Sequence, residues 1–199
     1  MFAVVESGKI TSMPRGNKGI TIGDNQYPAS IFTLWSESER NAIGVYTVEI
    51  DETNKKDSEY YTNTNITYAF SGGKVKGTYG TAAARSLVDT DATDGEGNKL
   101  KDGDGNQIIN EGLKTIKKRL LDNQCKDLLE PSDWMVVRAT ETETTMDSGW
   151  KTWRASVRTK CNSMQTQIDN ASDVDALAAL FTYTGTPPTR PLGEFPVKE

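Results

Sequence analysis

Histidine is absent from this chain of 199 residues, and only two cysteines are present. Histidine is the commonest general base and a leading metal ligand, so its absence argues against most hydrolytic and metal-dependent mechanisms. The cysteines, Cys125 and Cys161, form no Cys-x-x-Cys pattern, and a zinc site would need further ligands of a kind that the chain lacks. Both fall on apolar stripes, so we expect buried free thiols. We expect neither a metal nor a cofactor.

Long apolar runs are also lacking. No window approaches the roughly 18 apolar residues of a membrane span, and the N-terminal "MFAVVESGKITS" has no basic segment followed by an apolar one. We therefore expect a soluble protein without a signal peptide or membrane contact. The net charge of −5 argues against nucleic acid as the main partner, because its phosphates would be repelled.

Patterns typical of catalysis are weak. The stretch "TETETTMDS" contains Glu141, Glu143 and Asp147, but no apolar walls flank these carboxylates to shift their pKa values, which favours a solvated loop. The serines have neither a histidine partner nor a nucleophile-elbow motif. "SGGK" at 71–74 falls far short of a phosphate-binding loop. We expect that the protein is not an enzyme.

Residues 1–88 predict a small β-rich domain with one short helix. "FAVVESGKITSM" and "ITYAFSGGKVKGTYG" each contain two strand-like runs separated by a glycine turn, which is typical of β-hairpins. Between them, Ser36 and Glu39 fit a capping box, and Gly44 fits the position after a helix end. This predicts a helix over about 37–43 that leads into a strand.

Residues 89–110 are rich in Asp and Gly and contain a short repeat, "DGEGNKL" followed by "DGDGNQI". Asp102, Asp104 and Asn106 have the spacing of the first calcium ligands of an EF-hand. However, Gln107 stands where that loop requires glycine, and Leu113 stands where it requires a bidentate glutamate. We favour a linker or small hairpin built from Asp-Gly and Gly-Asn turns, which also marks the domain boundary.

Residues 111–182 predict a helical domain. Apolar residues recur at spacings of three and four over 111–129 and again over 150–168, and Pro131 ends the first of these helices. A third, shorter helix is expected from Ser172. The fold class is therefore α+β, with a β-rich N-terminal domain followed by a helical hairpin or small helical bundle. Residues 183–199 hold four of the seven prolines and predict an extended tail.

Three of the four tryptophans, Trp134, Trp150 and Trp153, lie within a short stretch beside Arg154 and Arg158. Each indole can bury roughly 150 to 250 Å², so the three could seal the end of a small helical unit. We favour a core role for Trp134 and Trp153. Tryptophan and arginine are also the residues most enriched at interface anchors, which is the alternative.

The same stretch carries a resemblance. "LLEPSDWMVVRA", followed after a gap by "WKTWRASVR", resembles the bacteriophage tail-fibre assembly proteins and related tail proteins, whose C-terminal unit combines a Leu-Leu-x-x-Ser/Thr-Asp-Trp turn with a Trp-x-x-Tyr-Arg-x-x-Leu-Arg helix. The matching residues are Leu128, Leu129, Ser132, Asp133, Trp134, Trp150, Arg154 and Arg158, whereas Trp153 and Val157 replace the usual Tyr and Leu. "MFAVVESGKIT" and "WSESERNAIGVYTVEI" are similar to the opening strands and short helix of that family.

The resemblance implies a non-enzymatic protein that acts by protein–protein contacts in tail-fibre assembly or attachment. Its partners would be phage tail or tail-fibre proteins, or a second copy of itself, and its place the virion tail or the host cytoplasm during assembly. The alternative is a permanent structural component of the tail, such as a fibre, baseplate or adaptor protein. Leu192 and Phe195 are the large apolar residues of the tail segment "RPLGEFPVKE", and we expect them to dock on another chain as an extended peptide.

Overall fold

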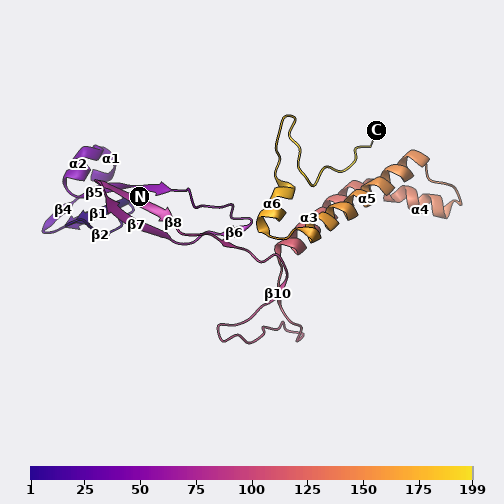
Figure 1. Cartoon of the computed structure of the whole chain (residues 1–199), viewed down its shortest axis with the longest axis horizontal. Coiled ribbons are helices and arrows are strands. Elements are labelled where there is room, and N and C mark those ends of the chain that lie inside the picture. Colours follow the sequence, from indigo (N-terminus) through magenta and orange to yellow (C-terminus); the bar gives the residue numbers. More distant parts are fainter. Residues whose placement is uncertain (199) are drawn as a thin grey trace. The chain divides into compact units, whose positions relative to one another are not determined.

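The computed structural model describes residues 1–198 and divides the chain into two compact units, Met1–Ala83 and Ala84–Glu199. Strands dominate the first unit and helices the second (Figure 1), so the expected α+β class is confirmed. The sequence placed the boundary near residue 88, five residues later than the structure does. Ser86 and Leu87 belong with the helical unit, because their carbonyls accept hydrogen bonds from Leu113 and Lys114 at 2.9 and 3.1 Å.

A five-stranded sheet forms the N-terminal unit, in the order β2-β1-β5-β8-β7. The strands are β1 (Phe2–Glu6), β2 (Lys9–Ser12), β5 (Val45–Asp51), β7 (Ile66–Ser71) and β8 (Lys74–Tyr79). All neighbours pair antiparallel except β5 and β8, which are parallel. The edge strands β2 and β7 contact each other, so the sheet is curled. Shorter strands are β3 (Ile20–Ile22), β4 (Asn25–Tyr27), β6 (Tyr61–Thr62) and β9 (Ala83–Ala84).

Both predicted hairpins are confirmed. The first turns at Ser7 and Gly8 and the second at Gly72 and Gly73, and all four residues have positive φ, as two-residue hairpin turns require. Inside the curl, Ala3, Val48 and Val75 are buried. The sheet closes tightly at Gly77, where an added Cβ would lie 2.8 Å from side-chain atoms of Ile66 and Tyr68.

Two short helices, and not one, cover the outer face of this sheet. They are α1 (Ile31–Leu34) and α2 (Glu37–Ala42). The capping box of α2 is confirmed, since Ser36 N donates to Glu39 Oε2 at 2.7 Å and Glu39 N donates to Ser36 Oγ at 3.3 Å. The helix α1 was missed because a single turn is too short to show periodicity. Its Ile31 and Phe32 pack with residues of β1 and β5 in a second buried cluster.

The Asp/Gly segment forms an antiparallel pair, β10 (Thr90–Asp91) and β11 (Ile109–Asn110), with two loops between the strands. Three residues spaced by eight close a ring of backbone hydrogen bonds: Ala92 N to Ile108 O, Leu100 N to Ala92 O, and Ile108 N to Leu100 O, at 2.8 to 2.9 Å. The repeat in the sequence is thus a repeat in the structure, with one loop in each copy.

The helical unit contains α3 (Leu113–Leu129), the 3-10 turn η1 (Glu130–Ser132), α4 (Asp133–Glu141), α5 (Ser148–Asn170) and α6 (Val174–Phe181). Helices α3 and α5 lie side by side (Figure 1). Their buried apolar residues follow the predicted stripes and include Leu113, Leu121, Val157, Cys161, Met164 and Ile168. Cys161 is buried and Cys125 half-buried, and both are free. Burial, followed by the nearby Cys125 and Asp122, raises the pKa of the Cys161 thiol to about 12, so it is an unreactive thiol.

Two helix predictions need correction. No helix was expected between Pro131 and residue 150, but α4 follows η1 directly, because proline is tolerated in a first helical turn even though it ends the helix before it. The third helix was expected from Ser172. Its N-cap is Asp173, whose carboxylate accepts a hydrogen bond from Ala176 N at 2.7 Å.

Candidate functional site

Arg154 joins the corner between α3 and α4 to α5. Its side chain is only 5% exposed. Nη1 donates to the carbonyl of Leu129 at 2.7 Å and also to Ser132 Oγ, while Nη2 donates to the Asp133 carboxylate. Ser132 Oγ in turn donates to the Leu129 carbonyl at 2.9 Å. Guanidinium offers donors in a fixed planar fork, so one side chain can satisfy three acceptors at once. We call this network of four residues the Arg154 clamp.

The clamp connects the two halves of the motif that carries the resemblance. Leu129, Ser132 and Asp133 come from its first block, and Arg154 comes from its second. Leu129 ends α3, where a helix leaves carbonyls without internal partners, and the arginine satisfies one of them. The motif therefore has a structural role, because its residues attach the corner between α3 and α4 to α5.

Trp134 is not a core residue. The prediction was wrong: its side chain is 54% exposed, and no residue of α4 is buried. The clamp holds Asp133, the residue directly before Trp134, against Arg154. Val136 and Val137 are also exposed, at 43% and 55%. Trp134 and Val137 are three residues apart and so share one side of α4, and we call these two residues the α4 apolar face.

Trp150 and Trp153 lie against the C-terminal tail. Their rings meet edge to face with centroids 5.6 Å apart. The indole N–H of Trp153 donates to the carbonyl of Pro196 at 3.0 Å, and Lys198 Nζ lies 5.4 Å from the centroid of Trp150. Both tryptophans are half-buried. They therefore bind the chain's own tail, and Trp150 also lines one hollow together with Trp134.

The tail packs on its own helical unit. Leu192 is fully buried, its N–H donates to the carbonyl of Leu180 at 3.1 Å, and its own carbonyl accepts from Lys160 Nζ at 2.9 Å. The expectation that Leu192 docks on another chain is therefore wrong. Phe195 is half-buried. Sequence patterns could not show this, because the partners of Leu192 lie on α5 and α6.

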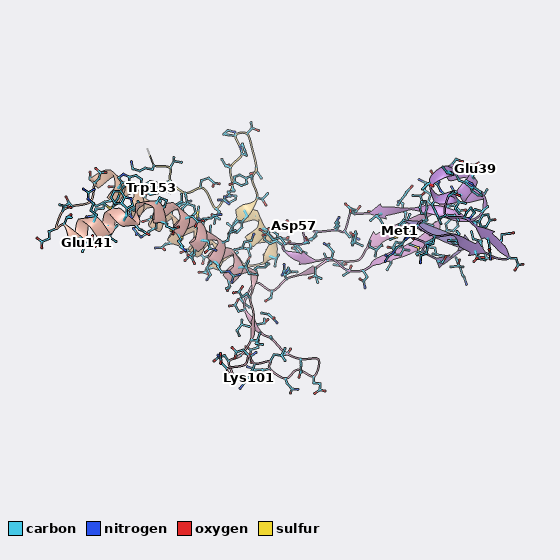
Figure 2. All side chains as sticks on the ribbon, turned by 180° about the vertical axis from the view of Figure 1, so that it is seen from behind. Met1, Glu39, Asp57, Lys101, Glu141 and Trp153 are labelled. Carbon is cyan, nitrogen blue, oxygen red and sulfur yellow. The ribbon has the colours of Figure 1, made fainter. Side chains whose placement is uncertain are left out.

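Two hollows flank the turn between α4 and α5. Glu141 lies at the outer end of the helical unit, where the chain turns (Figure 2). The first hollow, of about 490 Å³, is lined by Val136, Ala139, Thr140, Thr144, Thr145, Met146, Lys151, Arg154 and Arg158. The second, of about 550 Å³, is lined by Trp134, Met135, Arg138, Ala139, Thr142, Thr144, Thr145, Met146, Asp147 and Trp150. We call the two together the α4–α5 groove. Apart from Arg154, its basic residues Arg138, Lys151 and Arg158 are exposed.

Of the tryptophans and arginines proposed from the sequence, Trp134, Trp150, Arg154 and Arg158 line this groove, whereas Trp153 does not. Sequence reasoning missed Lys151 as a member. A signal for it existed, because Lys151, Arg154 and Arg158 are spaced by three and four and so share one side of α5.

In each of the two Asp/Gly loops, an aspartate carboxylate accepts hydrogen bonds from backbone N–H groups of the same loop. Asp102 Oδ1 accepts from the N–H groups of Asp104 and Asn106 at 3.0 and 2.8 Å, and Asp94 does the same one repeat earlier. The backbone hydrogen bond from Asn106, followed by its side-chain amide, holds the pKa of Asp102 below its ordinary value of 3.8. Across residues 1–198, no group of three or more His, Cys, Asp or Glu side chains is arranged to hold a metal ion.

None of the helices within residues 1–198 combines the length and the apolar character needed to cross a membrane. Comparison of the chain with protein-family models, with curated proteins and with solved structures gives no match.

Proposed function

We propose that this protein is a non-enzymatic bacteriophage tail-associated protein, which acts by protein–protein contacts in tail-fibre assembly or attachment. The observation that carries the proposal is the α4 apolar face. Two exposed apolar residues, one of them a tryptophan, share one side of a helix that has no buried residue. Exposed apolar patches with an aromatic anchor are typical of surfaces that bind another protein.

The Arg154 clamp supports this proposal, because it holds the start of α4, directly before Trp134, through hydrogen bonds from a buried side chain. Ser132 and Arg154 are both buried, and their contacts determine the direction in which α4 begins. A surface held in one orientation loses little conformational entropy on binding. The phage context comes from the motif: the residues of the clamp and Trp134 are those that resemble the tail-fibre assembly proteins.

Co-purification with the tail-fibre protein of the same phage tests the proposal. The double variant Trp134→Ala/Val137→Ala should lose the fibre while keeping its fold. A matched control is Leu120→Ala/Val197→Ala, which removes two apolar side chains that are also exposed in the helical unit, at 45% and 85%. The control should retain the fibre. If both double variants retain it, the α4 apolar face is not the binding surface.

The chain could leave after assembly or stay in the particle. Mass spectrometry of purified virions separates these outcomes. Its presence in stoichiometric amounts would make it a structural tail component, and its absence from particles that carry complete fibres would make it an assembly factor.

A further inference from the structure

Several basic side chains line the α4–α5 groove. Lys151, Arg154 and Arg158 line the first hollow, and Arg138 lines the second. Among the described residues 1–198, Arg154 is the only one of these four that has an ion-pair partner, Asp133. Within residues 1–198, the side chains of Arg138, Lys151 and Arg158 form no ion pair or hydrogen bond. This concentration of unpaired cations is unusual in a chain whose net charge is −5.

The first hollow has no acidic residue in its lining. Glu141 and Glu143 are exposed and line neither hollow. Asp147 lines the second hollow only, where its carboxylate caps α5 by accepting from Trp150 N at 3.0 Å. Like charges spaced by three or four residues on a helix repel one another, so the free groove has a reason to bind carboxylates.

The rest of the lining is apolar or carries hydroxyl groups. Val136, Ala139 and Met146 provide an apolar surface, and Thr140, Thr144 and Thr145 add hydroxyls beside it. A hollow of about 490 Å³ has the size of a site for a few side chains. Such a lining suits a peptide in which an apolar side chain is flanked by acidic ones.

We propose that the α4–α5 groove binds an acidic segment of the partner protein, with Lys151 and Arg158 pairing its carboxylates and Val136, Ala139 and Met146 contacting an apolar side chain between them. This inference rests on the proposed function and adds the chemistry of the partner. It differs from the α4 apolar face in what it recognises, because the groove selects for negative charge. Nucleic acid is a poorer match, since the acidic chain as a whole would repel its many phosphates.

The test is an NMR titration of the full ¹⁵N-labelled chain with the acetylated and amidated peptide Glu-Glu-Leu-Glu-Glu, beside the peptide Gln-Gln-Leu-Gln-Gln. The acidic peptide should shift the amide signals of residues 136–158 and bind at least about five-fold more tightly than the neutral one, as two exposed ion pairs would provide. Raising the salt concentration should weaken its binding, because exposed charges are screened.

The variant Lys151→Gln/Arg158→Gln should reduce acidic-peptide binding about five-fold. A matched control is Lys101→Gln/Lys126→Gln, which removes two positive charges that are exposed outside the groove, and it should bind as the unmodified chain does. Three results would overturn the inference: equal binding of the two peptides or none at all, equal effects of the two variants, or tighter binding of an oligothymidylate than of the acidic peptide. Sedimentation that shows a dimer lost only in the groove variant would also overturn it, because the occupant would then be a second copy.

The inference and the proposed function can fail separately. Absence of peptide binding, together with fibre capture that depends on Trp134, would remove the acidic segment and leave the function. Normal peptide binding by a chain that never captures the fibre would leave the acidic-segment site and remove the proposed function.

Discussion

The guanidinium of Arg154 on α5 lies 2.7 Å from the main-chain oxygen of Leu129, the last residue of α3. One side chain therefore donates a hydrogen bond to a carbonyl at the end of a helix, 25 positions earlier in the chain. The same group holds Ser132 and Asp133, so it fixes the start of α4, directly before Trp134. The proposed binding surface thus begins directly after a network of hydrogen bonds from a buried side chain.

Replacement of Arg154 should destabilise the helical unit. In Arg154→Met, the Leu129 carbonyl and the buried Ser132 hydroxyl lose a charged donor, which should cost roughly 2 to 3 kcal/mol of unfolding free energy. Urea unfolding followed by tryptophan fluorescence measures it, because three of the four tryptophans lie in this unit. Arg158→Met is the control and should change stability by less than about 0.5 kcal/mol. Equal effects would show that the clamp is unimportant.

Trp134→Ala should leave the fold nearly unchanged. Its indole is 54% exposed on a helix without buried residues, so we expect a loss of at most about 1 kcal/mol. A thermal melt by circular dichroism measures this. A loss near the roughly 3 to 5 kcal/mol of a core tryptophan would mean that Trp134 is buried after all.

Leu192→Ala should behave as a core substitution even though it lies in a proline-rich tail. The side chain is fully buried, so removing most of it should cost about 2 to 5 kcal/mol. The tail contacts of Trp153 should loosen, and its fluorescence should change accordingly. The comparison is Val197→Ala in the same tail, at a position 85% exposed. Unchanged stability of the Leu192 variant would return the tail to the role of a free peptide.

The Asp/Gly loops should lose their order in acid. Hydrogen bonds hold the pKa values of Asp94 and Asp102 below 3.8, so the ionised carboxylates favour the folded loops. That contribution is fully present above about pH 4 and is lost as the pH falls through the lower, folded-state values. The amide signal of Asn106 should therefore move with the titration of Asp102 during an NMR pH series. Asp102→Ala should abolish the effect, and Asp104→Ala, in the same loop, should not.

Local signals explain what could be predicted from the sequence. The hairpins at Gly8 and Gly73 and the capping box of α2 are each specified by neighbouring residues, and they are confirmed. The stripes of α3 and α5 are confirmed for a similar reason, because one buried side of a helix requires apolar residues at spacings of three and four.

Long-range contacts explain what could not be predicted. The parallel pairing of β5 with β8 depends on the closure of the sheet, and no local pattern encodes it. The hydrogen bonds that hold the start of α4 come from Arg154, which is on another helix. The burial of Leu192 depends on Lys160 and Leu180. The sequence predicted a buried Trp134 and a tail whose Leu192 docks on another chain. In the structure Trp134 is exposed, and Leu192 is buried in its own helical unit.

The central claim is that the helical unit binds a tail protein through the α4 apolar face. The most direct measurement is the affinity of the full chain and of Trp134→Ala/Val137→Ala for the purified tail-fibre protein, by calorimetry, with the melting temperature of each chain beside it. The account predicts that the double variant melts within a few degrees of the unmodified chain and binds the fibre at least about thirty-fold more weakly, as the loss of an anchor of about 2 kcal/mol implies. Unchanged affinity in a folded variant would contradict it.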